Sequence, residues 1–174
     1  MPEPELIEIP MTVDVPYRFS AGHFMGRFLT ELRDNGTFFG IRCPRCGRVQ
    51  MPPRVVCAVC HVPNTDWVKL GLEGTLAGFT IMYLPLTDPT TGKPHEPPFA
   101  YGSVRLDGSD SVVDHLLHVT PEVAHIWVGM RLRAVLRPQK DRIGDLSDIR
   151  YFEPLENQQK PEPKPSRKEP SDAR

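Results

Sequence analysis

All four cysteines of this chain lie in one short stretch, in two pairs of the form Cys-x-x-Cys. Cys43 and Cys46 form the first pair, Cys57 and Cys60 form the second, and ten residues separate the pairs. Two such pairs supply the four tetrahedral sulfur ligands that zinc prefers. Gly47 supports this interpretation, because a glycine directly after the second ligand permits the positive φ angle that the turn needs. The spacing therefore predicts one structural zinc ion per chain.

Three other chemistries use cysteines at a similar spacing. The run from Cys57 to His61 matches the attachment motif for c-type haem, and disulfides could also join the four thiols. Both need export or an oxidising compartment, whereas the residues Met1–Glu5 are acidic and no apolar signal run follows them. Iron in a rubredoxin-type or four-iron site uses the same ligands, so metal analysis must separate zinc from iron. Because four cysteines already fill a tetrahedron, His61 is interpreted as a flanking residue.

Composition limits the class of protein. The 174 residues include 21 basic and 22 acidic side chains, and this near-neutral balance does not indicate a general polyanion binder. Residues 1–16 hold four acidic side chains and no basic one, whereas residues 131–142 hold five basic side chains and one acidic one. No apolar run approaches the roughly 20 residues that cross a bilayer. We therefore expect a soluble, cytoplasmic protein with no membrane partner.

An extended arm and one amphipathic helix are expected before the cysteines. Residues 3–16 alternate apolar side chains between prolines, which fits a strand on its own domain, a frayed terminus or a segment that wraps a partner subunit. Ser20 can cap a helix that runs to about Asn35, where Asn35-Gly36 fits a left-handed C-cap. Part of the apolar face of this helix is expected to bind a partner, and its candidate residues are Phe24, Phe28 and Leu32.

The sequence after the cysteines changes to the alternation of β-strands. Strands are expected at 67–70, 74–83, 99–106, 112–119, 130–137 and 149–153, with a proline-rich loop at 85–98. Such short strands, with one helical turn after Thr120, fit a small closed barrel of the OB type, and a β-sandwich is the alternative. The predicted fold is mainly β with an N-terminal helix. Its parts are the arm and helix (1–39), a rubredoxin-like zinc ribbon (40–66), an OB-fold β-barrel (67–155) and a disordered tail (156–174).

This order of elements resembles a family of acyl-CoA-associated OB-fold proteins with a rubredoxin-like zinc ribbon, catalogued as a domain of unknown function. The resemblance covers residues 20–153 and is carried by the helix end 27–35, the run 42–54 with Cys57 and Cys60, the strand 74–80, Pro98–Tyr101 and Val128–Met130. Members of the family are accessory subunits or domains of thiolase-like enzymes, which make or break carbon–carbon bonds in acyl-CoA substrates. The resemblance implies a thiolase-like partner subunit and a coenzyme A ester as the ligand of the complex.

The candidate catalytic groups of the chain do not form a complete constellation. Asp114 and His115 are neighbours on an expected strand, so their side chains point to opposite faces and cannot act as an oriented pair. The ribbon uses every cysteine, and neither a nucleophile elbow nor a phosphate-binding glycine loop is present in the sequence. We therefore expect the chain not to be catalytic alone and the reactive group to belong to another subunit.

Arginines are the candidates for contact with coenzyme A, because a guanidinium group meets phosphate oxygens through two parallel hydrogen bonds. Arg131 and Arg133 lie on one face of an expected strand, and a solvated outer face of the barrel is the other interpretation of these two. Arg48 and Arg54 belong to the ribbon, where the resemblance is strongest.

Nucleic-acid binding is the alternative function, since zinc ribbons and OB barrels both serve it. Phe79, Tyr83 and Tyr101 are its stacking candidates, beside the basic strand at 130–137, although the same aromatic residues also fit a barrel core. The near-neutral charge and the acidic residues 1–16 oppose it. Absorbance of bound RNA or a co-purifying thiolase-like chain would distinguish the two functions.

Overall fold

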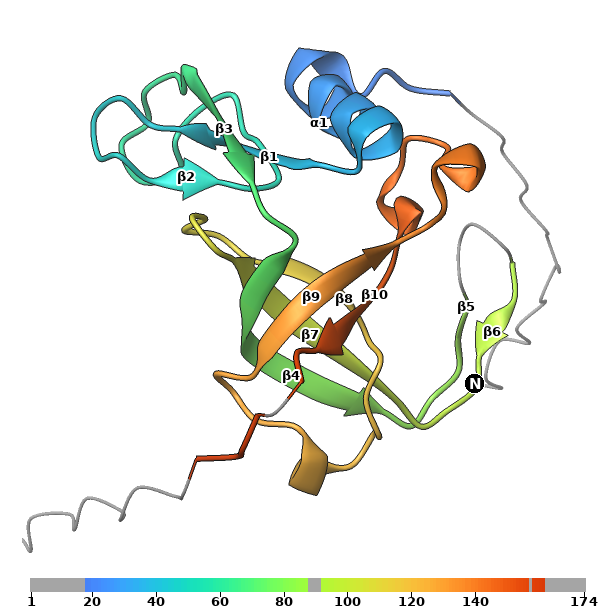
Figure 1. The fold of residues 1–174 in the computed structure, drawn as a ribbon. Helices are drawn as coiled ribbons and strands as arrows, with labels where there is room; N and C mark the ends of the chain where they lie inside the picture. Colours follow the sequence, from blue (N-terminus) through green and yellow to red (C-terminus); the bar gives the residue numbers. More distant parts are fainter. Residues whose placement is uncertain (1–17, 88–91, 157, 162–174) are drawn as a thin grey trace, which may run out of the picture.

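The computed structural model describes residues 18–87, 92–156 and 158–161. In this part of the chain it shows one α-helix, a three-stranded ribbon sheet and a closed barrel (Figure 1). The expected arm, and the tail beyond residue 161, lie outside the described residues. The fold is mainly β with an N-terminal helix, as predicted.

Helix α1 (Gly22–Asn35) forms where the sequence predicts it. The hydroxyl of Ser20 accepts a hydrogen bond from the Gly22 amide at 3.1 Å, which satisfies a free donor at the start of the helix. The C-terminal end has Gly36 in the left-handed region with φ 59°, and its amide donates to the Leu32 carbonyl at 3.1 Å. Both ends of the helix are therefore fixed by local sequence.

The ribbon sheet has the order β2-β1-β3, with β1 (Phe38–Arg42) between β2 (Val49–Gln50) and β3 (Asp66–Leu70). It is wider than the expected range 40–66, because Phe38 pairs with Leu70 at one end of the sheet. The strand expected at 67–70 is present as β3, but it belongs to this sheet and not to the barrel. Its alternating side chains would fit either sheet, so only its pairing with β1 shows that it belongs to the ribbon.

Five strands close the barrel in the order β10-β8-β7-β4-β9, and antiparallel pairing of β9 with β10 completes the circle. Side chains that point inward, such as Leu76, Leu132 and Phe152, have no exposed surface. The strands are β4 (Glu73–Met82), β7 (Phe99–Leu106), β8 (Val113–Leu117), β9 (Arg131–Leu136) and β10 (Ile149–Pro154). The barrel is thus confirmed in place of the sandwich.

Short elements connect these strands. The proline-rich loop contains a hairpin of β5 (Leu86–Thr87) and β6 (Pro94–His95), which extends to one side of the barrel (Figure 1). Three 3-10 turns follow: η1 (Val123–His125), η2 (Gln139–Asp141) and η3 (Leu146–Asp148). The η2–η3 loop lies against α1, where the Gln139 side chain donates to the Asp34 carbonyl at 2.8 Å.

One apolar core runs from α1 through the base of the ribbon into the barrel. The rings of Phe28 and Phe38 lie 6.3 Å apart between helix and ribbon, and Leu70 and Leu106 continue the core toward the barrel. The ribbon is therefore packed on the barrel and not merely joined to it. No helix among the described residues is long and apolar enough to span a membrane.

Candidate metal centre and partner surfaces

The two Cys-x-x-Cys pairs form two similar turns, which we call the knuckles (residues 43–48 and 57–62). In the first knuckle the Gly47 amide donates to the Cys43 carbonyl at 3.0 Å, and in the second the His61 amide donates to the Cys57 carbonyl at 3.0 Å. Gly47 has φ 73°, as its sequence position predicts, and His61 has φ 55° at the equivalent position. His61 thus serves the turn through its backbone.

The four sulfur atoms lie within 4.8 Å of one another. The Sγ atoms of Cys46 and Cys57 are 3.8 Å apart, which is about the edge of a tetrahedron whose four Zn–S bonds are ~2.3 Å long. Cys43 and Cys57 are buried, whereas Cys46 is exposed. The cysteines therefore fit a zinc ion, and four protein ligands leave no open position for water or substrate.

The two thiols of the second knuckle do not ionise equally. Hydrogen bonds from the backbone of Cys60 and Val59 lower the pKa of Cys57 to about 7. A hydrogen bond with Cys46 is the main reason that the pKa of Cys60 is raised to about 12. Four thiolates at this distance repel one another, so a dication that binds them releases protons. Arg42, Arg45, Arg48 and Arg54 lie in the same stretch of sequence as this negative centre, and all four are exposed.

The structure corrects two of the three candidate residues for partner contact. Phe28 and Leu32 have no exposed surface, so neither can touch another chain while the fold is intact. The sequence makes the ribbon look too small to cover them, but the base of the ribbon and the barrel together form one core. Phe24 differs, since it is half-buried and its ring stacks on Trp67 with centroids 5.7 Å apart. Partner contact at Phe24 stays a prediction.

Phe24 belongs to a surface cluster that the sequence does not reveal, which we call the aromatic patch (Phe24, Arg27, Phe39 and Trp67). The Arg27 guanidinium lies 4.5 Å from the centroid of the Trp67 ring and 5.7 Å from that of Phe39. Tryptophan, tyrosine and arginine are enriched among the few residues that dominate the binding energy of protein interfaces. The only sequence signal is the i,i+3 spacing of Phe24 and Arg27 on the helix, because the two rings of the ribbon reach it through the fold.

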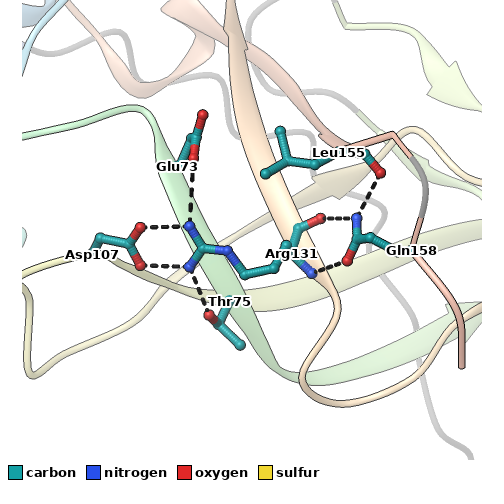
Figure 2. Close-up of polar contacts among 6 residues, drawn as sticks. All are labelled: Glu73, Thr75, Asp107, Arg131, Leu155 and Gln158. Carbon is teal, nitrogen blue, oxygen red and sulfur yellow. Dashed lines mark hydrogen bonds and ion pairs between the residues drawn. The ribbon is translucent and has the colours of Figure 1, made fainter. Parts of the chain in front are cut away.

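Arg131 of β9 lies in a network with two residues of β4, Glu73 and Thr75, and with Asp107 in the turn after β7 (Figure 2). Its guanidinium donates to both carboxylate oxygens of Asp107, at 2.6 and 2.5 Å, and lies 3.5 Å from a carboxylate oxygen of Glu73. The hydrogen bond to Arg131 lowers the pKa of Asp107 and raises that of Arg131. A phosphate would have to displace these carboxylates, so the geometry disfavours the coenzyme A contact expected at Arg131.

The other three candidate arginines differ in whether they have a carboxylate partner. Arg133 pairs with Glu153 at 3.0 Å on the outside of the barrel. Arg48 and Arg54 are exposed, and neither has an ion pair among the residues that the structure describes. The ribbon pair is therefore better placed to receive an anion than the strand pair.

The tail also differs from expectation at its start. The Gln158 side chain accepts from the Arg131 amide at 2.5 Å and donates to the carbonyls of Arg131 and Leu155, each at 2.7 Å (Figure 2). Within the tail that is expected to be disordered, Gln158 is thus bound to the start of β9. A prediction of disorder from low apolar content cannot detect a single side chain that hydrogen-bonds to the backbone of a strand, as Gln158 does at Arg131.

The remaining polar and aromatic candidates lie as follows. Asp114 accepts a hydrogen bond from the Ser103 hydroxyl on the outer face, whereas the His115 ring packs against Phe152 at 6.2 Å. This confirms that the two neighbours face apart. Desolvation by burial is the main cause of the lowered pKa of His115.

The stacking candidates for nucleic acid are dispersed. Phe79 packs against the core, Tyr101 is half-buried, and Tyr83 is 71% exposed. The three rings therefore do not form one exposed platform.

Two known domains of one family match the sequence of this chain. The rubredoxin-like zinc ribbon domain of ChsH2 matches residues 30–66, and the C-terminal OB-fold domain of ChsH2 matches residues 67–137. The two matches together span more than half of the chain. The chain belongs to the ChsH2 family. The resemblance that the sequence suggests is confirmed.

Individual relatives of this ChsH2-family chain are distant. A DUF35 domain-containing scaffold protein of Methanocaldococcus jannaschii is 25% identical over 131 residues, which are 73% of this chain and 88% of the relative. The solved Ltp2-ChsH2(DUF35) aldolase contains a chain of the same fold, with a TM-score of 0.53 and 20% identity over 78% of this chain and 98% of that one. A DUF35-family protein of unknown function from Sulfolobus solfataricus has a TM-score of 0.48 and 21% identity, over 63% of this chain and 75% of that one.

Proposed function

We propose that this protein is a non-catalytic subunit of a thiolase-like acyl-CoA enzyme complex, in which it aids assembly and acyl-CoA binding. The complex would make or break a carbon–carbon bond, as a thiolase or an aldolase does. Membership of the ChsH2 family carries the proposal. Two relatives support it: the archaeal protein is a scaffold protein by name, and the Ltp2-ChsH2(DUF35) assembly is an aldolase.

The form of the metal centre agrees with a role in assembly. A zinc ion with four sulfur ligands has no open position and cannot activate water, so it acts by holding the two knuckles together. The knuckles lie on the same ribbon that supplies Phe39 and Trp67 to the aromatic patch. Zinc thus stabilises the part of the chain that offers this surface to a partner.

Contact with a thiolase-like subunit is tested by charge reversal at the aromatic patch. The chain is co-expressed with the products of its neighbouring reading frames, any thiolase-like partner that co-purifies is identified by mass spectrometry, and the mass of the complex is measured by light scattering. Arg27→Glu removes the cation over Trp67, so we expect at least a tenfold loss of affinity, a typical effect for a residue at the centre of an interface. Arg105→Glu is the matched control, because Arg105 is also exposed but lies on a barrel strand.

Two outcomes would contradict the proposed function. One is a chain that purifies with nucleic acid, detected by absorbance, and forms no complex with the thiolase-like enzyme. The other is a complex that retains full turnover without this chain, which would show that the subunit has no role in the reaction. Equal affinity for the partner after Arg27→Glu and after Arg105→Glu would remove only the patch from the interface.

Coenzyme A is the proposed ligand of the assembled complex, with Arg48 and Arg54 as the first candidates for its phosphates. They are exposed and have no ion pair within the described part of the chain, whereas Arg131 and Arg133 have carboxylate partners. Double replacement of Arg48 and Arg54 by alanine should raise the KM for the acyl-CoA substrate, and the same change at Arg131 and Arg133 should raise it less. Unchanged KM values in both double variants, with the complex intact, would overturn the coenzyme A contact.

A further inference from the structure

A wide apolar cleft of about 1340 Å³ lies between the start of α1, the β5–β6 hairpin and the corner where η3 meets β10. Its lining includes Met25 and Leu29 from the helix, Phe99 and Leu116 from the barrel, and Leu146 from η3. The metal centre and the aromatic patch are elsewhere in the chain. This cleft is therefore a separate feature of the fold.

Apolar side chains at the cleft are open to solvent in the described structure. Leu86 of the hairpin is 44% exposed and Leu146 is 40% exposed. Single exposed leucines are common, but a contiguous apolar cleft of this size usually receives another group. The occupant must offer an apolar face and must be available to the free chain.

The start of the described chain lies at this cleft, since Phe19, Ser20 and Ala21 all line it. The segment that precedes Arg18 is therefore tethered within reach. A tethered segment has an effective concentration of order millimolar, whereas a separate molecule must be present at that concentration to compete equally. The tether favours the chain's own N-terminal segment over a second copy.

The sequence of that segment has the pattern that the cleft requires. Apolar side chains occupy every second position from residue 7 to residue 15, as Ile7, Ile9, Met11, Val13 and Val15. In an extended chain these five side chains share one face, and the residues between them share the other. Nine extended residues span roughly 30 Å.

Charge does not select the occupant, because the cleft lining carries both signs. Residues 1–16 carry Glu3, Glu5, Glu8 and Asp14 and no basic side chain. Arg137 and Arg150 are among the residues that line the cleft. Its two carboxylates, Asp114 and Asp145, already accept hydrogen bonds from the Ser103 hydroxyl and the Ser147 amide. Two arginines and two carboxylates balance in the lining, so the tether and the apolar pattern are what favour the N-terminal segment as the occupant.

We propose that residues 7–15 lie extended in this cleft, with Ile7, Ile9, Met11, Val13 and Val15 directed inward. Pro10 and Pro16 lack a backbone N–H, so the segment is held by side-chain burial and not by a complete strand ladder. The cleft is then an intramolecular docking site for the N-terminal segment, and this inference does not depend on the proposed function.

Amide hydrogen exchange on the full-length chain tests the proposal with matched neighbours. Met11→Asp places a charge on the inward face, and Thr12→Asp places the same charge one residue away on the outward face. In the unaltered chain we expect residues 7–15 to exchange several-fold more slowly than an unstructured peptide. Met11→Asp should abolish this protection, speed exchange in residues 144–151 and increase binding of a hydrophobic dye, whereas Thr12→Asp should do none of these.

A second pair of variants probes the same contact from the cleft. Leu146→Asp lies in the cleft and Ile143→Asp lies outside it, and both parent side chains are at least 40% exposed, so both variants should fold and keep zinc. Leu146→Asp should release residues 7–15, whereas Ile143→Asp should not. Unprotected exchange of residues 7–15 in the unaltered chain would overturn the proposal. So would protection that disappears on dilution together with a change from dimer to monomer mass, because the occupant would then be a second copy.

Discussion

The knuckles of the ribbon and the barrel differ in what fills their interiors. Around the knuckles, Val55, Val56 and Val59 are 56%, 44% and 55% exposed, and within the knuckles the buried residues are Cys43 and Cys57. In the barrel, Leu132 and Phe152 have no exposed surface. A short loop cannot enclose enough apolar surface to be stable alone, so metal coordination replaces a core there. Stability of the two regions should therefore respond to different changes.

Loss of a metal ligand should have the largest effect, and it should be confined to the ribbon at first. Cys57→Ser removes a buried ligand from a centre of a kind that stabilises small domains by the order of 10 kcal/mol. We expect zinc content to fall from one ion per chain to nearly none, with fast amide exchange at residues 43–62 and retained protection at residues 99–106. Val59→Ser is the control, because Val59 lies in the same knuckle but its side chain is exposed.

If Cys57→Ser unfolds the barrel as completely as the ribbon, the barrel also depends on the metal and the two regions are not stabilised separately. A metal-stabilised ribbon is also contradicted if freshly purified, reduced protein contains no metal. Iron in place of zinc would change the identity of the ion, but the ribbon would still be the region that a metal stabilises.

Removal of a core side chain from the barrel should give the opposite result. Leu132→Ala leaves a cavity at a fully buried position and should lower the free energy of unfolding by about 2–5 kcal/mol. Zinc should remain at one ion per chain. Arg133→Ala, at the next residue, removes only an exposed ion pair with Glu153 and should cost less than about 1 kcal/mol. Urea denaturation measures the free energy of unfolding of both variants, and metal analysis measures their zinc content. Loss of zinc from Leu132→Ala would show that the ribbon and the barrel are not stabilised separately.

A third change acts on the backbone of the first knuckle. A Cβ atom at Gly47 would meet no other atom within 4 Å, so its φ of 73° is the only obstacle to a side chain. Gly47→Ala should therefore destabilise the ribbon by about 1–2 kcal/mol through conformation alone. His61→Gly, at the equivalent position of the second knuckle, relieves the same strain but adds freedom to the unfolded chain, so its net effect should be close to zero. Zinc affinity measured with a competing chelator compares the two, and equal losses would contradict this account.

The smallest effect concerns pH. Burial lowers the pKa of His115 below its usual value of 6.5, so folding favours the neutral ring. As pH falls below 6.5, the unfolded chain binds a proton that the folded chain resists, and stability is lost in that window. His115→Gln should reduce the loss of unfolding free energy between pH 7 and pH 5. Denaturation curves at both pH values, on protein that retains its zinc, measure this slope, and an unchanged slope would assign the acid sensitivity to other groups.

The features that the sequence predicts correctly are those fixed within a few residues. The two Cys-x-x-Cys turns, the left-handed Gly36 and the inward alternation of β7 each depend on local spacing. The expected boundaries of α1 and of the barrel strands agree with the structure to within about two residues for the same reason.

The features that it does not predict depend on contacts between distant residues. β3 has the alternation of any half-buried strand, and only its pairing with β1 places it in the ribbon. Phe28 looks available to a partner until the base of the ribbon covers it. Arg131 looks available to phosphate until the fold brings Asp107, 24 positions away, against its guanidinium. Pairing across strands is set by the whole fold, so a single sequence does not reveal which charges neutralise each other.

The short passage from ribbon to barrel has a mechanical consequence. Only Gly71 and Leu72 separate the end of β3 from the start of β4, and Leu70, beside this junction, is part of the common core. A hinge needs a few residues that can change conformation without breaking contacts, and this junction has no such slack. A subunit that binds the ribbon would therefore also fix the orientation of the barrel. Because the common core also holds the ribbon on the barrel, a few glycines inserted after Leu70 should leave the two parts moving as one body, which amide exchange across the core would measure.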